Sequence, residues 1–217
     1  MIDKAENDRL SLLEQHENEA RRRGCRFVAG VDEVGAGALA GPVVACCLMF
    51  EAGVRIAGID DSKRLRPQKR EELNSQILDC ALAVGLGTCS NAEIDYLGNM
   101  GKSIRLAMER AVAELCQKAG VVPDVLLVDG VRRIDGFPGI PQSLITRGDS
   151  ASVSIAAASI VAKVARDAHM RELHQQHPAY GFAQHKGYGT KAHFSAIARH
   201  GSCGVHRLSF KLSGIRA

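Results

Sequence analysis

The sequence predicts an α/β domain built on a mixed β-sheet. Apolar runs of strand length alternate with helical patterns along the chain, which is typical of a sheet flanked by helices. Two strand-like runs stand close together near the start, at 27–31 and 42–50, and indicate an opening hairpin. The 217 residues, of which 46% are hydrophobic, are enough for one domain or at most two small ones.

The expected strands are short and apolar. The run Pro42–Phe50 is apolar throughout, which indicates a strand buried on both faces. The other strands are expected at 27–31, 81–89, 125–128 and 143–146.

The expected helices fill most of the remaining chain. Pro67 suits the first turn of a helix over Pro67–Cys80. The segment Ser154–Met170 consists largely of Ala, Ser, Val and Ile, so this helix can pack very close to the sheet. Further helices are expected over residues 1–23 before Gly24, from Asn91, in a longer stretch that stops at Gly120, and near 190–200.

Composition narrows the class of protein. Lys and Arg exceed Asp and Glu by 28 to 24, a net charge of +4, which permits a nucleic-acid partner without requiring one. No apolar run is long enough to span a bilayer, so no membrane is expected. The seven cysteines have no Cys-x-x-Cys spacing, and we expect reduced thiols in a cytoplasmic protein.

Four acids stand where predicted strands end or helices begin: Asp32, Glu33, Asp129 and Asp149. Ligands gather at such strand ends in α/β sheets, and converging carboxylates would need divalent cations of the Mg²⁺ or Mn²⁺ class. Each acid also has a structural interpretation. Asp149 looks first like a helix N-cap and Asp129 like a turn residue. Spacing alone does not establish that the four meet.

Asp32 and Glu33 are the hardest of these acids to explain structurally. Neighbouring strand residues point to opposite faces, so one of the two would face the core unless the strand ends there. Gly35 and Gly37 make such an ending plausible.

Several other residues could touch a polyanion. The segment Gly35-Ala36-Gly37 could let backbone N–H groups approach a sugar or phosphate, or it could be a plain hairpin turn. Lys63 could meet a phosphate, although a solvated turn is the preferred interpretation. Lys163 is a lesser phosphate candidate, because it stands four residues before Asp167 and could simply pair with it.

Tyr188 lies in a loop bounded by glycines, beside basic residues. An aromatic face there could stack on a sugar or a base. It could equally pack on the domain with its hydroxyl in water. The histidines at 174, 177, 193, 200 and 206 show no convincing ligand spacing and are expected to be structural.

Taken together, these segments resemble bacterial ribonuclease HII. The matching residues run in order over about 26–210, so a chance match is not credible. They are VAGVDEVG at 28–35, LAGPVVA at 39–45, DSK at 61–63, EID at 93–95, VDG at 128–130, GDS at 148–150, AAASIVAKV at 156–164 with RD at 166–167, YGF at 180–182, HKGYGT at 185–190, and HR at 206–207 with SF at 209–210.

The resemblance implies a ribonuclease H-like fold with a mixed five-stranded sheet and extra C-terminal helices. Residues 1–25 would form a helical extension and 26–217 the catalytic domain, with a helical part at about 171–217. It also implies an endonuclease that cuts the RNA strand of RNA/DNA hybrids and incises beside single ribonucleotides in duplex DNA. A monomer is expected, and Lys211–Ala217 shows no persuasive sliding-clamp motif.

The resemblance also assigns residues. The family's four metal-binding carboxylates fall on Asp32, Glu33, Asp129 and Asp149, which overrides the N-cap interpretation of Asp149. Its substrate-sensing tyrosine falls on Tyr188, which would stack near the deoxyribose after the ribonucleotide. Two ions about 4 Å apart would then clamp the scissile phosphate, and the products would carry 3′-OH and 5′-phosphate ends.

One departure from the family matters. Where the family has Gly-Arg-Gly, this chain has Gly35-Ala36-Gly37, so a guanidinium with up to five donors is missing. We expect weaker substrate binding or junction selectivity, by about 1–3 kcal/mol as for one charged hydrogen bond. An alternative is a catalytically weakened relative that still binds hybrids. A resolvase or transposase of similar fold is disfavoured by the Tyr188 loop.

Overall fold

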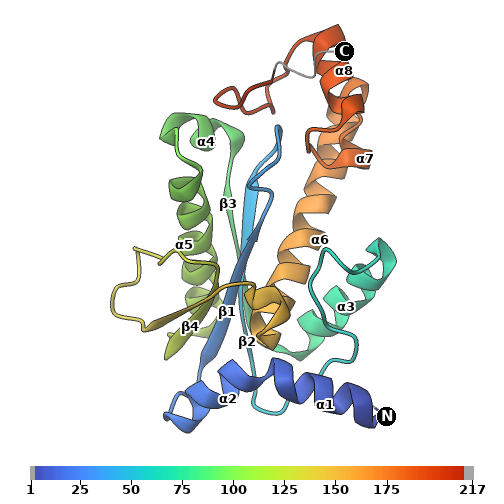
Figure 1. The fold of residues 1–217 in the computed structure, drawn as a ribbon. Helices are drawn as coiled ribbons and strands as arrows, with labels where there is room; N and C mark the ends of the chain where they lie inside the picture. Colours follow the sequence, from blue (N-terminus) through green and yellow to red (C-terminus); the bar gives the residue numbers. More distant parts are fainter. Residues whose placement is uncertain (1–2, 213–217) are drawn as a thin grey trace.

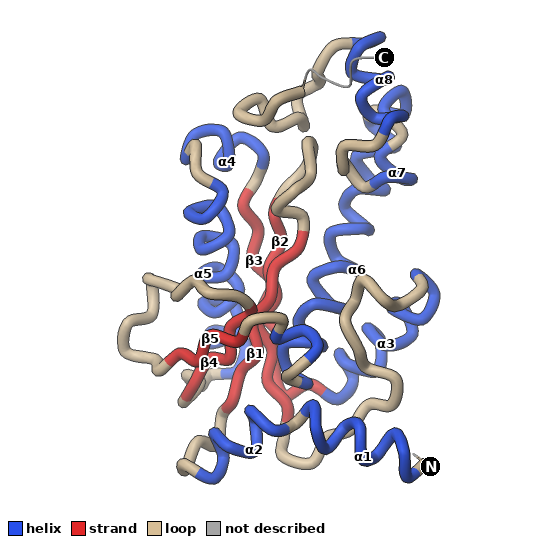
Figure 2. The backbone as a smooth tube through the Cα atoms, in the orientation of Figure 1, coloured by secondary structure: helices blue, strands red, loops and turns tan. Residues whose placement is uncertain are grey.

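A five-stranded sheet forms the centre of the computed structural model, which describes residues 3–212 (Figures 1 and 2). Its strands are β1 (Val28–Val34), β2 (Val43–Phe50), β3 (Ala81–Cys89), β4 (Val125–Asp129) and β5 (Gln142–Ile145). They lie in the order β3-β2-β1-β4-β5. The pairs β1–β2 and β2–β3 are antiparallel, and β1–β4 and β4–β5 are parallel. The predicted mixed sheet is confirmed.

Helices cover both faces of this sheet. The helix α5 (Met100–Ala119) lies on one face, while α6 (Val153–Gln176) and α3 (Pro67–Cys80) lie on the other (Figure 1). Alternate residues of β2 enter the two cores, because successive strand side chains point to opposite faces. Val43, Ala45, Cys47 and Met49 pack towards α5, and Cys46, Leu48 and Phe50 pack towards α3 and α6. The unbroken apolar run of β2 therefore reflects burial on both sides.

Glycines set how closely the helices approach the sheet. A Cβ atom added at Gly85 or Gly87 of β3 would lie about 2 Å from a carbonyl oxygen of α5. A Cβ atom added at Gly30 of β1 would lie 2.2 Å from the backbone of Ser154 in the first turn of α6. The close packing predicted for the small-residue helix is confirmed, and it brings the start of α6 against β1.

The N-terminal segment forms two helices instead of the single one predicted. These are α1 (Lys4–Leu13) and α2 (Gln15–Arg22), and the break falls at Glu14, whose ψ angle is 4°. Leu10 and Leu13 are buried against the α3–α6 core. Glu17 of α2 accepts hydrogen bonds from the hydroxyls of Ser152 and Ser154, so the break lets α2 bind the start of α6.

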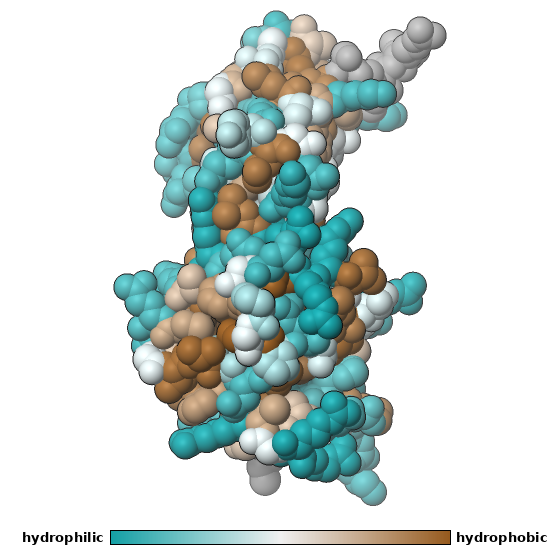
Figure 3. All heavy atoms as spheres, turned by 90° about the vertical axis from the view of Figure 1, so that its left-hand side faces the viewer, coloured by the Kyte–Doolittle hydropathy of each residue, from teal (hydrophilic) through white to brown (hydrophobic). Residues whose placement is uncertain are grey.

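The C-terminal part lies beyond one end of the sheet, joined to it by the long helix α6 (Figure 1). It contains α7 (Phe182–His185), within the predicted loop at 180–189, and α8 (Lys191–His200). The helix α6 runs on past the predicted end at Met170 to Gln176. Figure 3 shows the surface narrowing between the two parts, with hydrophilic side chains gathered at the narrowing.

The remaining helix, α4 (Asn91–Leu97), begins at the predicted residue and carries a capping box between Ser90 and Glu93. None of the helices within residues 3–212 is both long and apolar enough to cross a membrane. Residues 213–217 lie outside the described residues. They belong to the predicted helical C-terminal part and to the segment expected to lack a sliding-clamp motif.

Candidate active site

Three of the predicted acids meet at the end of the parallel strand pair β1–β4. Carboxylate oxygens of Asp32, Glu33 and Asp129 lie within 4.8 Å of one another. The register explains this, since Val31 pairs with Val128 and the next residue on each strand is an acid. The carboxyl ends of parallel strands meet at one edge of a sheet, where ligands bind. The sheet pairing therefore brings together residues that are far apart in the sequence.

The strand β1 does not end at Asp32, as its glycines had suggested, but continues to Val34. Asp32 is consequently buried, with 4% of its surface exposed, and Glu33 is half-buried. The backbone N–H of Glu33 donates to Oδ1 of Asp32 at 2.7 Å. A buried carboxylate needs compensation for its lost hydration.

The acids raise one another's pKa values. Burial, followed by the charges of Glu33 and Asp129, holds the pKa of Asp32 well above its usual range. Burial and then Asp129 raise the pKa of Glu33. Burial and the nearby Asp149 also raise the pKa of Asp129, against the hydrogen bond from Gly148. The site has a deficit of positive charge, and its oxygen-only donors fit a hard divalent cation such as Mg²⁺ or Mn²⁺.

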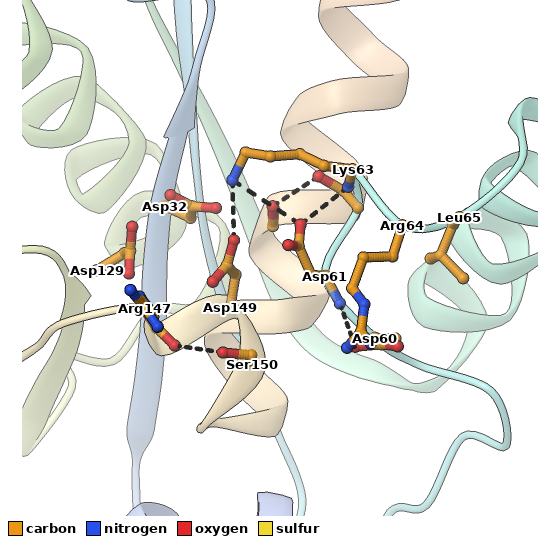
Figure 4. Close-up of polar contacts among 12 residues, drawn as sticks. Asp32, Asp60, Asp61, Lys63, Arg64, Leu65, Asp129, Arg147, Asp149 and Ser150 are labelled. Carbon is orange, nitrogen blue, oxygen red and sulfur yellow. Dashed lines mark hydrogen bonds and ion pairs between the residues drawn. The ribbon is translucent and has the colours of Figure 1, made fainter.

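Asp149 lies beside this group but is engaged by Lys63. The Nζ atom of Lys63 donates to Oδ2 of Asp149 at 2.9 Å and lies 3.8 Å from Asp61 (Figure 4). Asp149 is buried in a single 3-10 turn, Gly148–Ser150, ahead of α6. The N-cap interpretation of Asp149 is wrong, because the hydroxyl of Ser152 accepts from the backbone N–H of Ile155 and caps the helix.

The Asp149 turn is tied to the Asp129 strand end. The backbone N–H of Gly148 donates to Oδ1 of Asp129 at 2.6 Å. Arg147 takes a left-handed conformation at φ 57° to make this turn, which is costly for a residue with a Cβ. The turn interpretation of Asp129 is wrong, because Asp129 is the last residue of β4 and the chain bends only at Gly130, whose φ is 85°. The structure thus places all four predicted acids in one region, three of them within ligand distance of each other.

Lys63 occupies the edge of this region with three-quarters of its side chain exposed. Partial burial lowers the pKa of Lys63, but the hydrogen bond and charge of Asp149 outweigh it and raise the pKa. The ammonium group is therefore charged and partly open to solvent beside the acids. The interpretation of Lys63 as part of a merely solvated turn is incomplete, since the residue contacts Asp149 directly.

Two buried arginines contact the Gly35-Ala36-Gly37 segment, Arg207 through hydrogen bonds and Arg166 by packing against Gly35. The guanidinium of Arg207 donates to the carbonyl oxygens of Gly35 and Ala36 at 2.8 and 2.9 Å. A Cβ atom added at Gly35 would lie 2.1 Å from Nε of Arg166, and Gly35 has φ 93°. Gly37 is exposed, with nothing near its missing side chain. The inner carbonyls are thus anchored while the outer glycine stays open.

Sequence reasoning missed the role of these arginines. Arg166 and Arg207 are both 0% exposed, and Arg166 donates to the carbonyls of Ala40, Pro42 and Lys186. The available signals were the position of Arg166 in a helix rich in small residues and the place of both arginines in segments that resemble the family. A fully buried cation must be compensated, and here backbone carbonyls supply the compensation.

Tyr188 lies over two cations of α6. In the sequence, it is far from the strand-end acids. Its ring centroid is 5.9 Å from Nζ of Lys163 and 5.3 Å from the guanidinium carbon of Arg166. Lys163 also donates to Asp167 at 2.6 Å, so the predicted pairing is confirmed. The loop of Tyr188 contacts the chain just after the glycine segment, because the N–H of Leu39 donates to the carbonyl of Gly187. The two loops predicted to meet substrate are therefore neighbours.

Comparisons with known proteins extend this picture. A family model for ribonuclease HII matches residues 29–213. A ribonuclease HII of Geobacter metallireducens is 50% identical over 195 residues, covering 90% of this chain and 88% of that protein. A ribonuclease HII of Geotalea uraniireducens is 47% identical over 204 residues, covering 94% and 91%.

Solved structures share the fold at lower identity. The ribonuclease H2 of Pyrococcus horikoshii has a TM-score of 0.71 at 24% identity, covering 86% of this chain and 94% of that one. The ribonuclease HII of Archaeoglobus fulgidus, solved in complex with PCNA, has a TM-score of 0.70 at 24% identity, covering 88% and 98%. By its family model and its close relatives, the chain belongs to the ribonuclease HII family and is a divalent-metal-dependent ribonuclease H.

Proposed function

We propose that the protein hydrolyses the RNA strand of RNA/DNA hybrids and incises 5′ of single ribonucleotides in duplex DNA. The products would carry 3′-OH and 5′-phosphate ends. The observation that carries this proposal is the group of Asp32, Glu33 and Asp129 at the β1–β4 strand ends, with Asp149 beside it. Membership of the ribonuclease HII family supports the substrate class.

The same four acids would hold the metal. Their donors are all carboxylate oxygens, and a solved relative of this fold, a ribonuclease HIII, was crystallised with Mn²⁺. Two bound Mg²⁺ or Mn²⁺ ions would activate water and stabilise the leaving 3′-oxygen. The chain's own contribution is to hold the four carboxylates at buried and half-buried positions and to keep Lys63 charged next to them.

Substrate would span from these acids to the C-terminal loop. Gly35, Ala36 and Gly37 would approach the ribose 2′-OH, the group that distinguishes RNA from DNA. Lys63 would contact a backbone phosphate, and Lys163 would be a second basic contact beside Tyr188. Phosphate contacts of this kind make binding weaken as salt rises.

The main test uses three duplexes: all DNA, DNA with one embedded ribonucleotide, and an RNA/DNA hybrid. We expect cleavage of the second and third in Mg²⁺ or Mn²⁺ and none of the first. Binding of the hybrid without cleavage would instead establish the alternative of a catalytically weakened relative that still binds hybrids. The presence of Ala36 in place of arginine is the reason for considering that alternative. A resolvase-type activity would cut the all-DNA duplex.

A monomeric state and a cytoplasmic location remain predictions, the latter consistent with seven free thiols.

Metal should stabilise the protein more at high pH than at low pH. Burial and mutual charge raise the pKa values of Asp32, Glu33 and Asp129. When folding raises the pKa of a carboxyl, the group does not destabilise the folded state at a pH below its unfolded-state pKa of about 4. It destabilises the folded state as the pH rises through its folded-state pKa. The bound cation offsets that repulsion once the acids ionise.

Thermal unfolding with and without Mg²⁺ at pH 5.5 and pH 8 measures this effect. We expect a larger metal-induced rise in Tm at pH 8. An equal rise at both pH values would show that the acids are not the groups that respond to metal.

Restoring the missing guanidinium should improve the enzyme. Ala36 is half-buried and its carbonyl is held by Arg207, so an Ala36→Arg side chain would have to leave the core and reach outward. One charged hydrogen bond of about 1–3 kcal/mol corresponds to roughly a 5- to 150-fold gain in kcat/KM on a duplex with one ribonucleotide. Ala36→Met, of similar length without the charge, is the matched control. An unchanged rate for Ala36→Arg would rule out this explanation of the departure.

A further inference from the structure

Two buried imidazoles face each other in the C-terminal part of the molecule. The Nε2 atoms of His193, on α8, and His206 are 3.1 Å apart. Their side chains are almost fully buried, at 0% and 1% exposure. The acid cluster does not use either residue, and the sequence offered only a generic structural role for both. Two ring nitrogens at this distance share a single proton, since one must donate and the other accept.

The backbone at each end determines where that proton lies. The N–H of Cys203 donates to Nδ1 of His206 at 2.9 Å, so that nitrogen carries no proton. The thiol of Cys203, at 3.2 Å, can also donate to Nδ1. The carbonyl oxygen of Cys203 lies farther from Nδ1, at 3.3 Å. The proton of His206 is therefore on Nε2 and is donated to Nε2 of His193. His193 then carries its proton on Nδ1, which donates to the carbonyl of Tyr188 at 3.0 Å.

This chain of hydrogen bonds ends on the loop proposed to read the substrate. The N–H of Tyr188 donates to the carbonyl of His185, so the peptide groups on both sides of Tyr188 are held. The next residue after His206 is Arg207, which binds the carbonyls of Gly35 and Ala36. The dipeptide His206-Arg207 thus fixes both loops, one through His193 and the other directly.

We propose that His193 and His206 are positioning residues that hold the Tyr188 loop through a neutral imidazole pair. Their function is to keep the Tyr188 ring at the place where the sugar after the ribonucleotide binds, so they set selectivity for an RNA–DNA junction. This inference rests on the proposed function. Neither imidazole touches the reacting phosphate in this assignment.

The pair works only while both rings are neutral. A second proton on Nε2 of His193 would place two N–H groups against each other across 3.1 Å, and one on Nδ1 of His206 would face the N–H of Cys203 at 2.9 Å. Burial, and then the nearby His185 and His206, lower the pKa of His193 to about 4, and burial lowers the pKa of His206. Titratable and charged groups that face the pair from the surrounding segments are His177, Tyr180, His185 and Cys203.

The sign of the pH effect follows from these shifts. A histidine whose pKa is lowered by folding contributes stability that is complete above about 6.5, the unfolded value, and is lost as pH falls towards the folded value. The Tyr188 loop should therefore loosen between pH 6.5 and pH 4.

Two amide substitutions separate the two ring nitrogens of His193. In His193→Asn, Nδ2 replaces Nδ1 and can still donate to the Tyr188 carbonyl. In His193→Gln, the amide instead reaches the position of Nε2 and faces His206. The matched control is His200→Asn, which changes an exposed histidine at the end of the same helix α8.

The first measurement is amide hydrogen exchange of residues 186–190, which does not depend on activity. We expect faster exchange in His193→Gln, with His193→Asn closer to the wild-type protein and His200→Asn unchanged. The second is kcat/KM on the single-ribonucleotide duplex relative to the uniform hybrid. We expect that ratio to fall about 5-fold in His193→Gln, the factor for one ordinary hydrogen bond, and less in His193→Asn.

The outcomes separate the inference from the proposed function. Equal exchange and an equal substrate ratio in both variants and the wild-type protein would overturn the positioning role. A wild-type protein that cleaves neither substrate would overturn the proposed function, and the exchange measurement would then decide by itself whether His193 holds the loop. Long-range ¹⁵N correlation of the imidazoles gives a direct check, since a proton on Nε2 of His193 contradicts the assigned chain.

Discussion

Replacing Asp129 with Asn is expected to lower metal-dependent cleavage by more than ~100-fold, since even residues that only support a metal ligand commonly contribute 10- to 100-fold. The substitution removes one negative charge from the group that lies within 4.8 Å. It keeps the shape of the side chain, and Oδ1 of Asn can still accept the hydrogen bond that Gly148 donates to Asp129. The loss should therefore reflect metal binding and not a misplaced Asp149 turn.

The same substitution should stabilise the protein when metal is absent. Asp129 contributes to the raised pKa values of both Asp32 and Glu33, so its removal relieves like-charge repulsion. Thermal unfolding in EDTA at pH 8 should give a higher Tm for Asp129→Asn than for the wild-type protein. Enzymes often show such a conflict between stability and activity at their sites.

The control for this experiment is Asp79→Asn. Asp79 is an exposed residue of α3, a helix that packs against the sheet. In the sequence, Asp79 is far from each of the strand-end acids. Its substitution should leave the cleavage rate and the Tm in EDTA within experimental error. If Asp129→Asn cleaves at the wild-type rate, the assignment of the acid group as the metal site is wrong.

Replacing Arg207 with Met is expected to destabilise the fold by about 3 kcal/mol or more, at 1–3 kcal/mol for each buried polar group left without a partner. The guanidinium of Arg207 is fully buried and donates to three carbonyls, those of Gly35, Ala36 and Gly41. Burial lowers the pKa of Arg207 to about 10, which shows how strongly the site resists a charge. Met removes that charge, but the three carbonyls lose their donors.

Urea unfolding measures this loss, and two further variants interpret it. Arg207→Lys keeps the charge but lacks the planar fork of donors, so we expect an intermediate loss. Arg199→Met alters an exposed arginine of α8 and should change stability by no more than ~0.5 kcal/mol. A stability change as small for Arg207→Met as for Arg199→Met would show that the carbonyls find other partners. Cleavage by Arg207→Met, measured where the protein is still folded, should show a raised KM because the glycine segment is no longer held.

Local pattern was sufficient for most of the fold. The helix Pro67–Cys80 and the strand Ala81–Cys89 have the bounds predicted from sequence, because Pro67 marks a helix start and the apolar pattern changes at Ala81. The lengths of β1 and α6 were underestimated. Both elements continue past their predicted ends into more polar segments, Asp32 to Val34 and Arg171 to Gln176. Tertiary contacts stabilise these extensions.

The site was less accessible to sequence reasoning. From spacing alone, Asp149 looked like an N-cap, and only the resemblance to ribonuclease HII grouped it with Asp32, Glu33 and Asp129. The grouping depends on β1 pairing with β4, which joins residues nearly a hundred positions apart through Val31 and Val128. No local periodicity carries that information.

The sequence by itself predicted the mixed sheet, most of the helices and, through its motifs, the family, and it assigned the four acids as an expectation. Only the tertiary structure showed that Lys63 engages Asp149, that Arg207 holds the glycine segment while Arg166 packs against Gly35, and that His193 and His206 join the Tyr188 loop to the C-terminal segment. The physical reason is the range of the interactions. Strands and helices follow from burial patterns between near neighbours, whereas these contacts link buried charges and imidazoles to partners in distant segments, and only the folded chain brings those partners within hydrogen-bond distance.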